Sequence, residues 1–172
     1  MNLRVPLLAL VLAMTAVSAR ADLFTSPAQS FETADRIVLR KGERRLSLYR
    51  NGQEIRAYKV SLGLRPVGDK EREGDFRTPE GRYSLTRRNP DSDFFLSIQV
   101  SYPDAQDIAA ARRNGVPPGG AIMIHGLPNI MKHPRDRYLS TDWTDGCIAL
   151  SNEDMLEVWL LTSPDTPIEI TP

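Results

Sequence analysis

Short runs of apolar residues, broken by turn residues, dominate the chain after residue 35. Leu46 and Leu48 alternate with polar positions, Asn51-Gly52 is a turn dipeptide that tolerates positive φ, and 55–61 follows as a partner strand. This pattern predicts a β-hairpin. Further strands are predicted over Arg36–Arg40, Arg82–Arg87, Leu96–Ser101, Ala121–Ile124 and Ile168–Thr171.

Helical patterns are fewer than strand patterns. The stretch 104–113 is rich in alanine, opens with the capping residue Asp104 and closes near Gly115. Ser151 followed by Asp154 resembles a capping box. Its helix is predicted to turn five apolar residues toward the core: Met155, Leu156, Val158, Trp159 and Leu160. The chain is therefore predicted to be mainly β with a few helices, as a β-sandwich or barrel.

The first 21 residues have the pattern of a secretory signal peptide. Arg4 is a basic start, 5–17 is an apolar stretch, and 19–21 read Ala-Arg-Ala, a small-x-small cleavage pattern. The apolar run is too short to span a bilayer comfortably, so cleavage after Ala21 is expected rather than an uncleaved anchor. The sequence predicts a periplasmic or secreted protein with no integral membrane segment after cleavage.

Removal of the signal peptide from the 172 residues leaves a chain long enough for one hydrophobic core. We expect 22–35 to be an N-terminal extension and 36–172 to be a single domain. Without Arg4 and Arg20, the 22 basic residues fall to 20 against 22 acidic ones, a formal charge of −2. This balance gives no electrostatic case for a nucleic-acid partner.

Cys147 is the only cysteine and follows His125 by 22 positions. A lone thiol cannot form an internal disulfide in an exported chain. His125 ends a short apolar strand, so its imidazole is expected at the rim of a sheet. Gly146 permits a tight turn of the backbone just before Cys147. An imidazole can take the thiol proton and activate the sulfur toward a carbonyl. From residue types alone, a buried structural cysteine and a structural histidine remain alternatives.

The segment 68–81 is dense in charge and glycine, and by composition it reads as a solvated surface loop. It lacks the Lys-Ser or Lys-Thr ending of a phosphate-binding loop, so a nucleotide site is not predicted. His133 lies between Lys132 and Pro134 and is expected on a surface loop. Two histidines and one cysteine at these spacings form no recognisable zinc ligand set, so no metal and no other cofactor is predicted.

Three ordered motifs together resemble the L,D-transpeptidase (YkuD) catalytic domain family. They are Ile124-His125-Gly126, then Thr144-Asp145-Gly146-Cys147-Ile148-Ala149-Leu150, and upstream Arg77-Thr78-Pro79-Glu80-Gly81. The resemblance covers about residues 37–170. It implies a YkuD-like β-sandwich or barrel in which the catalytic cysteine precedes a helix, so that 36–172 would be the catalytic domain.

The resemblance also implies roles for individual residues. Cys147 would be the nucleophile, His125 its base, and the Gly126 carbonyl would orient the imidazole. Backbone amides around Asp145, Gly146 and Cys147 would form the oxyanion hole. Substrate-binding candidates are Trp143, Lys70 and Arg77. The implied partner is the peptidoglycan stem peptide, attacked at the L-centre carbonyl of its third, diamino-acid residue with release of the terminal D-alanine.

Two departures from the family pattern leave the outcome of the reaction open. Asp145 stands where the family usually has a second histidine, and Ala149 where it usually has arginine. The Asp-Trp-Thr-x-Gly-Cys-Ile-Ala form resembles a subgroup that includes an enzyme releasing an outer-membrane lipoprotein from peptidoglycan. Three interpretations remain: cross-linking to an amine, hydrolysis that trims stem peptides or releases the lipoprotein, and a non-catalytic peptidoglycan-binding envelope module.

Overall fold

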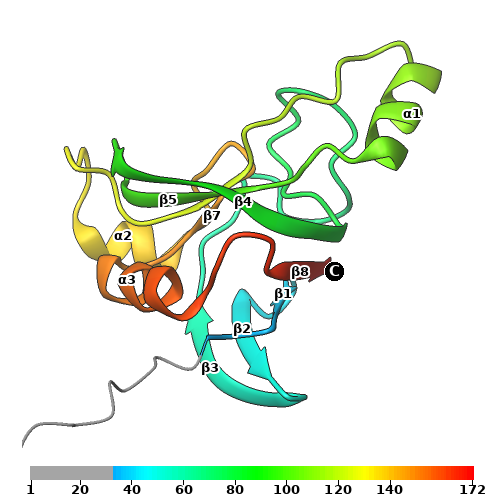
Figure 1. The fold of residues 1–172 in the computed structure, drawn as a ribbon. Helices are drawn as coiled ribbons and strands as arrows, with labels where there is room; N and C mark the ends of the chain where they lie inside the picture. Colours follow the sequence, from blue (N-terminus) through cyan, green and yellow to red (C-terminus); the bar gives the residue numbers. More distant parts are fainter. Residues whose placement is uncertain (1–32) are drawn as a thin grey trace, which may run out of the picture. The chain divides into compact units, whose positions relative to one another are not determined.

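The computed structural model describes residues 33–172. The predicted signal peptide (1–21), and residues 22–32 of the predicted extension, lie outside the described residues. Eight strands form a sheet in the order β3-β2-β1-β8-β4-β5-β6-β7 (Figure 1). In chain order the elements are β1 (Arg36–Arg40), β2 (Arg45–Arg50), β3 (Gln53–Lys59), β4 (Gly81–Ser92), β5 (Phe95–Val100), α1 (Ala105–Arg113), β6 (Met123–His125), α2 (Arg135–Ser140), β7 (Ile148–Ala149), α3 (Asn152–Leu161) and β8 (Pro167–Thr171).

The predicted mainly β fold and its hairpin are confirmed. β2 and β3 pair in antiparallel fashion around Asn51-Gly52, both of which have positive φ, and Leu46 and Leu48 are fully buried. Positive φ at both turn positions matches the right-handed twist of the flanking strands. β1 then pairs with β2 on one side and runs parallel to β8 on the other.

The helix starts are confirmed, but one predicted helix face is partly wrong. Ser151 Oγ accepts the Asp154 amide at 3.0 Å and begins α3, while a reciprocal capping box begins α1. Met155 and Val158 are fully buried. Leu156 is 44% exposed and Leu160 48% exposed. Because α3 packs one face against β5, these two leucines point to solvent.

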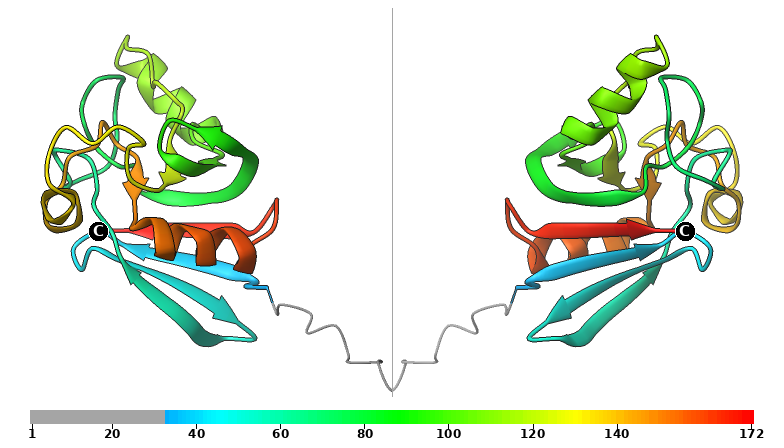
Figure 2. Two further views of the ribbon diagram at one scale, coloured as in Figure 1. Left: turned by 90° about the vertical axis from the view of Figure 1, so that its left-hand side faces the viewer. Right: turned by 90° about the vertical axis from the view of Figure 1, so that its right-hand side faces the viewer.

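The helices lie at different ends of the domain. In Figures 1 and 2, α3 lies beside the sheet, whereas α1 projects from the opposite end of the domain. The loop between β3 and β4 extends toward the α1 end, and α2 lies next to α3 (Figure 1). In residues 33–172, no helix is long and apolar enough to cross a bilayer.

Candidate active site

Parallel pairing of β6 with β7 brings the histidine and the cysteine segments together. The register places His125 opposite Ala149, and the Leu150 amide donates to the His125 carbonyl at 2.9 Å. Cys147 immediately precedes β7, so its thiol enters at the same edge of the sheet as the imidazole. Both side chains line one cavity of about 780 Å³.

The imidazole of His125 is held in one tautomer. His125 is 4% exposed, and its Nδ1 lies 2.7 Å from the Gly126 carbonyl oxygen. A carbonyl only accepts, so Nδ1 must carry the proton and Nε2 keeps a free lone pair. Burial lowers the pKa of His125 to about 4, although the hydrogen bond to Gly126 acts in the opposite direction. The ring is therefore a neutral base at neutral pH.

Aromatic rings fix the imidazole from two sides. The Phe94 and Trp143 ring centroids lie 4.7 and 5.7 Å from that of His125. Trp143 is anchored in turn, because its Nε1–H donates to the Tyr138 carbonyl at 3.0 Å and its ring meets the Tyr138 ring edge-on at 5.0 Å. This packing limits rotation of the base and keeps water away from it.

The thiol of Cys147 is neutral at rest. The residue is half-buried, and Sγ lies 3.6 Å from the Ala121 carbonyl oxygen. Burial raises the pKa of the Cys147 thiol; a hydrogen bond from the Met123 backbone opposes this, and the Asp145 carboxylate adds to it. Because the imidazole is neutral too, the proton that the two groups could exchange rests on sulfur.

Thr144 shapes the turn that carries the cysteine. It is buried, and its Oγ1 donates to the Cys147 carbonyl at 2.8 Å and accepts the Gly146 amide at 3.2 Å. The Gly146 N–H is therefore engaged within the turn. Of the three amides expected in an oxyanion hole, this one already has a partner within the turn.

Gly146 itself is required by the backbone. Its φ is +128°, and a Cβ added there would lie 2.6 Å from the Arg77 carbonyl oxygen. We expect Gly146→Ala to lower the free energy of unfolding by about 3 kcal/mol, from backbone strain and overpacking together. Urea unfolding measures this loss. Gly52→Ala is the control, because Gly52 has φ +78° with nothing within 4 Å, so it should lose only about 1 kcal/mol. Equal losses would contradict the close approach.

The charged segment 68–81 is more buried than its composition indicates. Lys70 and Asp75 are each 6% exposed, and Lys70 Nζ lies 2.7 Å from Asp75 Oδ1. Asp75 also accepts the amides of Glu71, Arg72 and Arg77. Burial raises the pKa of Asp75, but Lys70 and the amides outweigh it and leave that pKa below its usual value. The segment is a surface loop, exposed at 71–74, that a buried ion pair braces, and part of it lines the cavity.

The three residues predicted to bind substrate differ in whether their side chains line the cavity. Trp143 and Lys70 line the cavity with Cys147, although the ammonium of Lys70 is already paired with Asp75. Arg77 directs its guanidinium to Glu71 at 3.2 Å and reaches the cysteine turn through its backbone oxygen. Residues 33–172 contain no cluster of three or more His, Cys, Asp or Glu side chains that could hold a metal ion.

Sequence reasoning missed two parts of this site. Phe94 lies in the turn between β4 and β5, and its backbone carbonyl oxygen accepts a hydrogen bond from the Gly126 amide at 3.0 Å. Lys41 is 2% exposed and binds the Gly68 and Thr78 carbonyls and the Glu80 carboxylate, which anchors the charged segment. Neither residue stands in a motif, so only the pairing of strands distant in sequence could have revealed them.

Comparison with known proteins gives a consistent family signal. The family model described as "L,D-transpeptidase catalytic domain" (YkuD) matches residues 34–170. The Escherichia coli strain K12 protein named "Putative L,D-transpeptidase YafK" is 38% identical over 96 residues, which are 52% of this chain and 37% of YafK. The chain thus aligns with well under two thirds of that relative.

Solved structures share the fold. The helical cell shape determining protein Pgp2 from Campylobacter jejuni superposes with a TM-score of 0.60 at 27% identity, covering 78% of this chain and 46% of Pgp2. Bd1075 of Bdellovibrio bacteriovorus gives 0.56 at 26% identity, covering 79% and 47%. An L,D-transpeptidase from Mycobacterium smegmatis, at 14% identity with a TM-score of 0.52 over 79% of this chain and 58% of that one, has the same fold.

Proposed function

Because this chain belongs to the L,D-transpeptidase catalytic domain family over residues 34–170, we propose that it is a cysteine acyl-transfer enzyme of peptidoglycan metabolism that works in the periplasm or outside the cell. Cys147 is the nucleophile and His125 is its base. One observation carries the proposal: both side chains line one cavity, and the Gly126 carbonyl holds the tautomer whose Nε2 can accept a proton.

Acylation proceeds from the neutral pair. Nε2 of His125 takes the thiol proton as Sγ of Cys147 attacks the carbonyl at the L-centre of the stem peptide's diamino acid. The carbonyl electrons move to oxygen, where the Asp145 and Cys147 amides donate to the negative charge. Collapse breaks the amide bond, and the imidazolium returns its proton to the leaving nitrogen of D-alanine. A thioester remains on Cys147.

Deacylation decides between the two enzymatic outcomes. Attack on the thioester by an amine of a second stem peptide forms a new cross-link, and Nε2 of His125 takes the amine proton and then protonates the departing sulfur. Attack by water leaves a shortened stem peptide. If the amine expelled in the first step belongs to an outer-membrane lipoprotein, the same chemistry releases that lipoprotein.

Product analysis tests the proposal and selects the acceptor. The purified protein is incubated separately with tetrapeptide muropeptides and with lipoprotein-linked peptidoglycan, and adducts and products are followed by mass spectrometry. We expect an acyl adduct on Cys147. Dimers linked between two diamino acids identify an amine acceptor, and shortened stems or free lipoprotein without dimers identify water. Binding without any adduct or product would contradict the enzyme and support a non-catalytic envelope module.

A further inference from the structure

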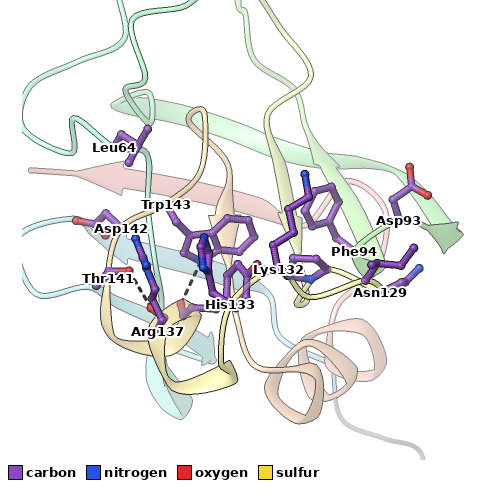
Figure 3. Close-up of a pocket in the computed structure, with 13 residues that line it drawn as sticks. Leu64, Asp93, Phe94, Asn129, Lys132, His133, Arg137, Thr141, Asp142 and Trp143 are labelled. Atoms are coloured by element: carbon purple, nitrogen blue, oxygen red, sulfur yellow. Dashed lines mark hydrogen bonds between the residues drawn. The ribbon is translucent and has the colours of Figure 1, made fainter.

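A second hollow, of about 550 Å³, is lined by the aromatic rings of Phe94 and Trp143 (Figure 3). The two rings stack with centroids 6.0 Å apart and an interplanar angle of 28°. Phe94, Trp143 and Asp93 line both this outer hollow and the cavity that holds Cys147. The two spaces are therefore neighbours that share these three residues as a common wall, called here the Phe94–Trp143 wall.

The cavity that holds Cys147 is acidic. Three carboxylates line it, those of Glu73, Asp93 and Asp145. Apart from the neutral imidazole of His125, its one basic side chain among the described residues is Lys70, whose ammonium lies 2.7 Å from the buried Asp75 carboxylate. A substrate carboxylate placed here would face three like charges, whereas a substrate ammonium would be stabilised.

The outer hollow carries two cations that the acidic cavity lacks, and it shares the Asp93 carboxylate with that cavity. Lys132 and Arg137 line it, both are exposed, and neither forms an ion pair within residues 33–172. The Asp142 carboxylate, also in the lining, is neutralised by Arg44, with Nη2 2.8 Å from Oδ2. Figure 3 shows Lys132 beside Phe94 and Arg137 toward Asp142 and Thr141, so the two cations stand at different sides of the hollow.

The outer hollow also offers apolar contact. Leu64 and Ile130 line it and are 56% and 84% exposed. Apolar side chains beside unpaired cations suit a small ligand that carries a carboxylate on an apolar residue. A peptide end with this chemistry would bury the leucine and isoleucine surface and pair with Lys132 or Arg137.

We propose that the outer hollow is a substrate subsite for a carboxylate-bearing part of the peptide, while the ammonium-bearing part occupies the acidic cavity beside Cys147. The identity of the substrate rests on the proposed function. The opposed charges orient the peptide across the Phe94–Trp143 wall, because the reverse placement would set each charged group against like charges. The subsite thereby determines which carbonyl is presented to the thiol.

Charge reversal tests the subsite by binding alone. In a Cys147→Ala background, Lys132→Glu/Arg137→Glu is compared with its parent by calorimetry, using the stem tetrapeptide with free carboxylates and the same peptide with all carboxylates amidated. We expect the affinity for the free peptide to fall at least about tenfold and that for the amidated peptide to change less than about threefold. Lys59→Glu/Arg87→Glu is the control, with the same change in net charge on exposed strand residues outside both hollows.

Equal losses for both peptides, or an equal loss in the control, would overturn the subsite. Lys132→Gln/Arg137→Gln is a milder variant that covers the case in which the charge-reversed protein does not fold. It should weaken binding of the free peptide about threefold. An unchanged affinity of this variant would also overturn the subsite. The binding measurement does not depend on catalysis. If the unmutated protein formed no acyl adduct while the charge-dependent binding persisted, the proposed function would fail and the subsite would stand.

Discussion

Cys147→Ala is expected to eliminate the acyl adduct and to lower kcat/KM by at least about 10⁴-fold, while peptide binding remains within about threefold of wild type. Removal of the sulfur leaves the amides and the cavity able to hold the peptide but removes the atom that attacks it. The fold should persist, since the half-buried thiol makes only weak hydrogen bonds, at 3.6 Å to the Ala121 carbonyl oxygen and with the Met123 backbone. Single-turnover rates and intact-protein mass spectrometry measure both effects.

Cys147→Ser separates loss of shape from loss of reactivity. The hydroxyl fills nearly the same space as the thiol, but it is a far weaker acid, so a neutral imidazole ionises it much less readily. The serine variant should therefore bind like wild type and lose about as much rate as the alanine variant. Turnover by Cys147→Ala above the uncatalysed rate, or an adduct on another residue, would contradict the assignment of the nucleophile.

The fold was predictable wherever local patterns determine structure. Alternation at Leu46 and Leu48, the Asn51-Gly52 turn, and the caps at Asp104 and Ser151 are all short-range signals, and the structure confirms each. β6 ends at His125 as predicted, but begins at Met123 rather than at Ala121, because Ala121 is exposed with φ of 54°.

Features created by long-range pairing were not predictable. β7 has two residues and forms by pairing with β6 and with Ser61, both distant in sequence, and α2 has no side-chain N-cap to signal its start. Leu156 and Leu160 fit a helical period, but the sequence does not tell which face of the helix is buried. That face is determined by the contact of α3 with β5. For the same reason, the burial of Lys70 with Asp75 was invisible in a segment whose composition is that of a solvated loop.

In the candidate site, too, residues in local motifs were predictable and features built by long-range pairing were not. Its cysteine, histidine and glycines stand in contiguous motifs, so resemblance located them. The Phe94–Trp143 wall and the contrasting charges on its two sides are assembled from β4–β5, the 127–143 segment and the cysteine turn. No single motif encodes them, so these features required the structure.

His125→Asn is expected to lower kcat/KM at least about 10³-fold and to remove the acid limb of its pH profile. Asparagine Nδ2 can replace Nδ1 as the donor to the Gly126 carbonyl, but the side chain has no counterpart of Nε2 and so cannot take the thiol proton. In wild type, the acid limb should lie near pH 4 and not near the ordinary 6.5, because burial lowers the pKa of His125 to about 4. Rates measured from pH 3.5 to 8 locate it.

The same histidine should make the fold sensitive to acid. The unfolded chain binds the His125 proton below its ordinary pKa of 6.5, whereas the folded protein binds it only near 4. Stability therefore falls as pH drops from 6.5 to 4, by about 3 kcal/mol, and this contribution changes no further below that range. Urea unfolding of His125→Asn should lack this slope, and His133→Gln, a change at the exposed histidine, should retain it. Parallel stability curves for wild type and His125→Asn would show that His125 is not held neutral by burial.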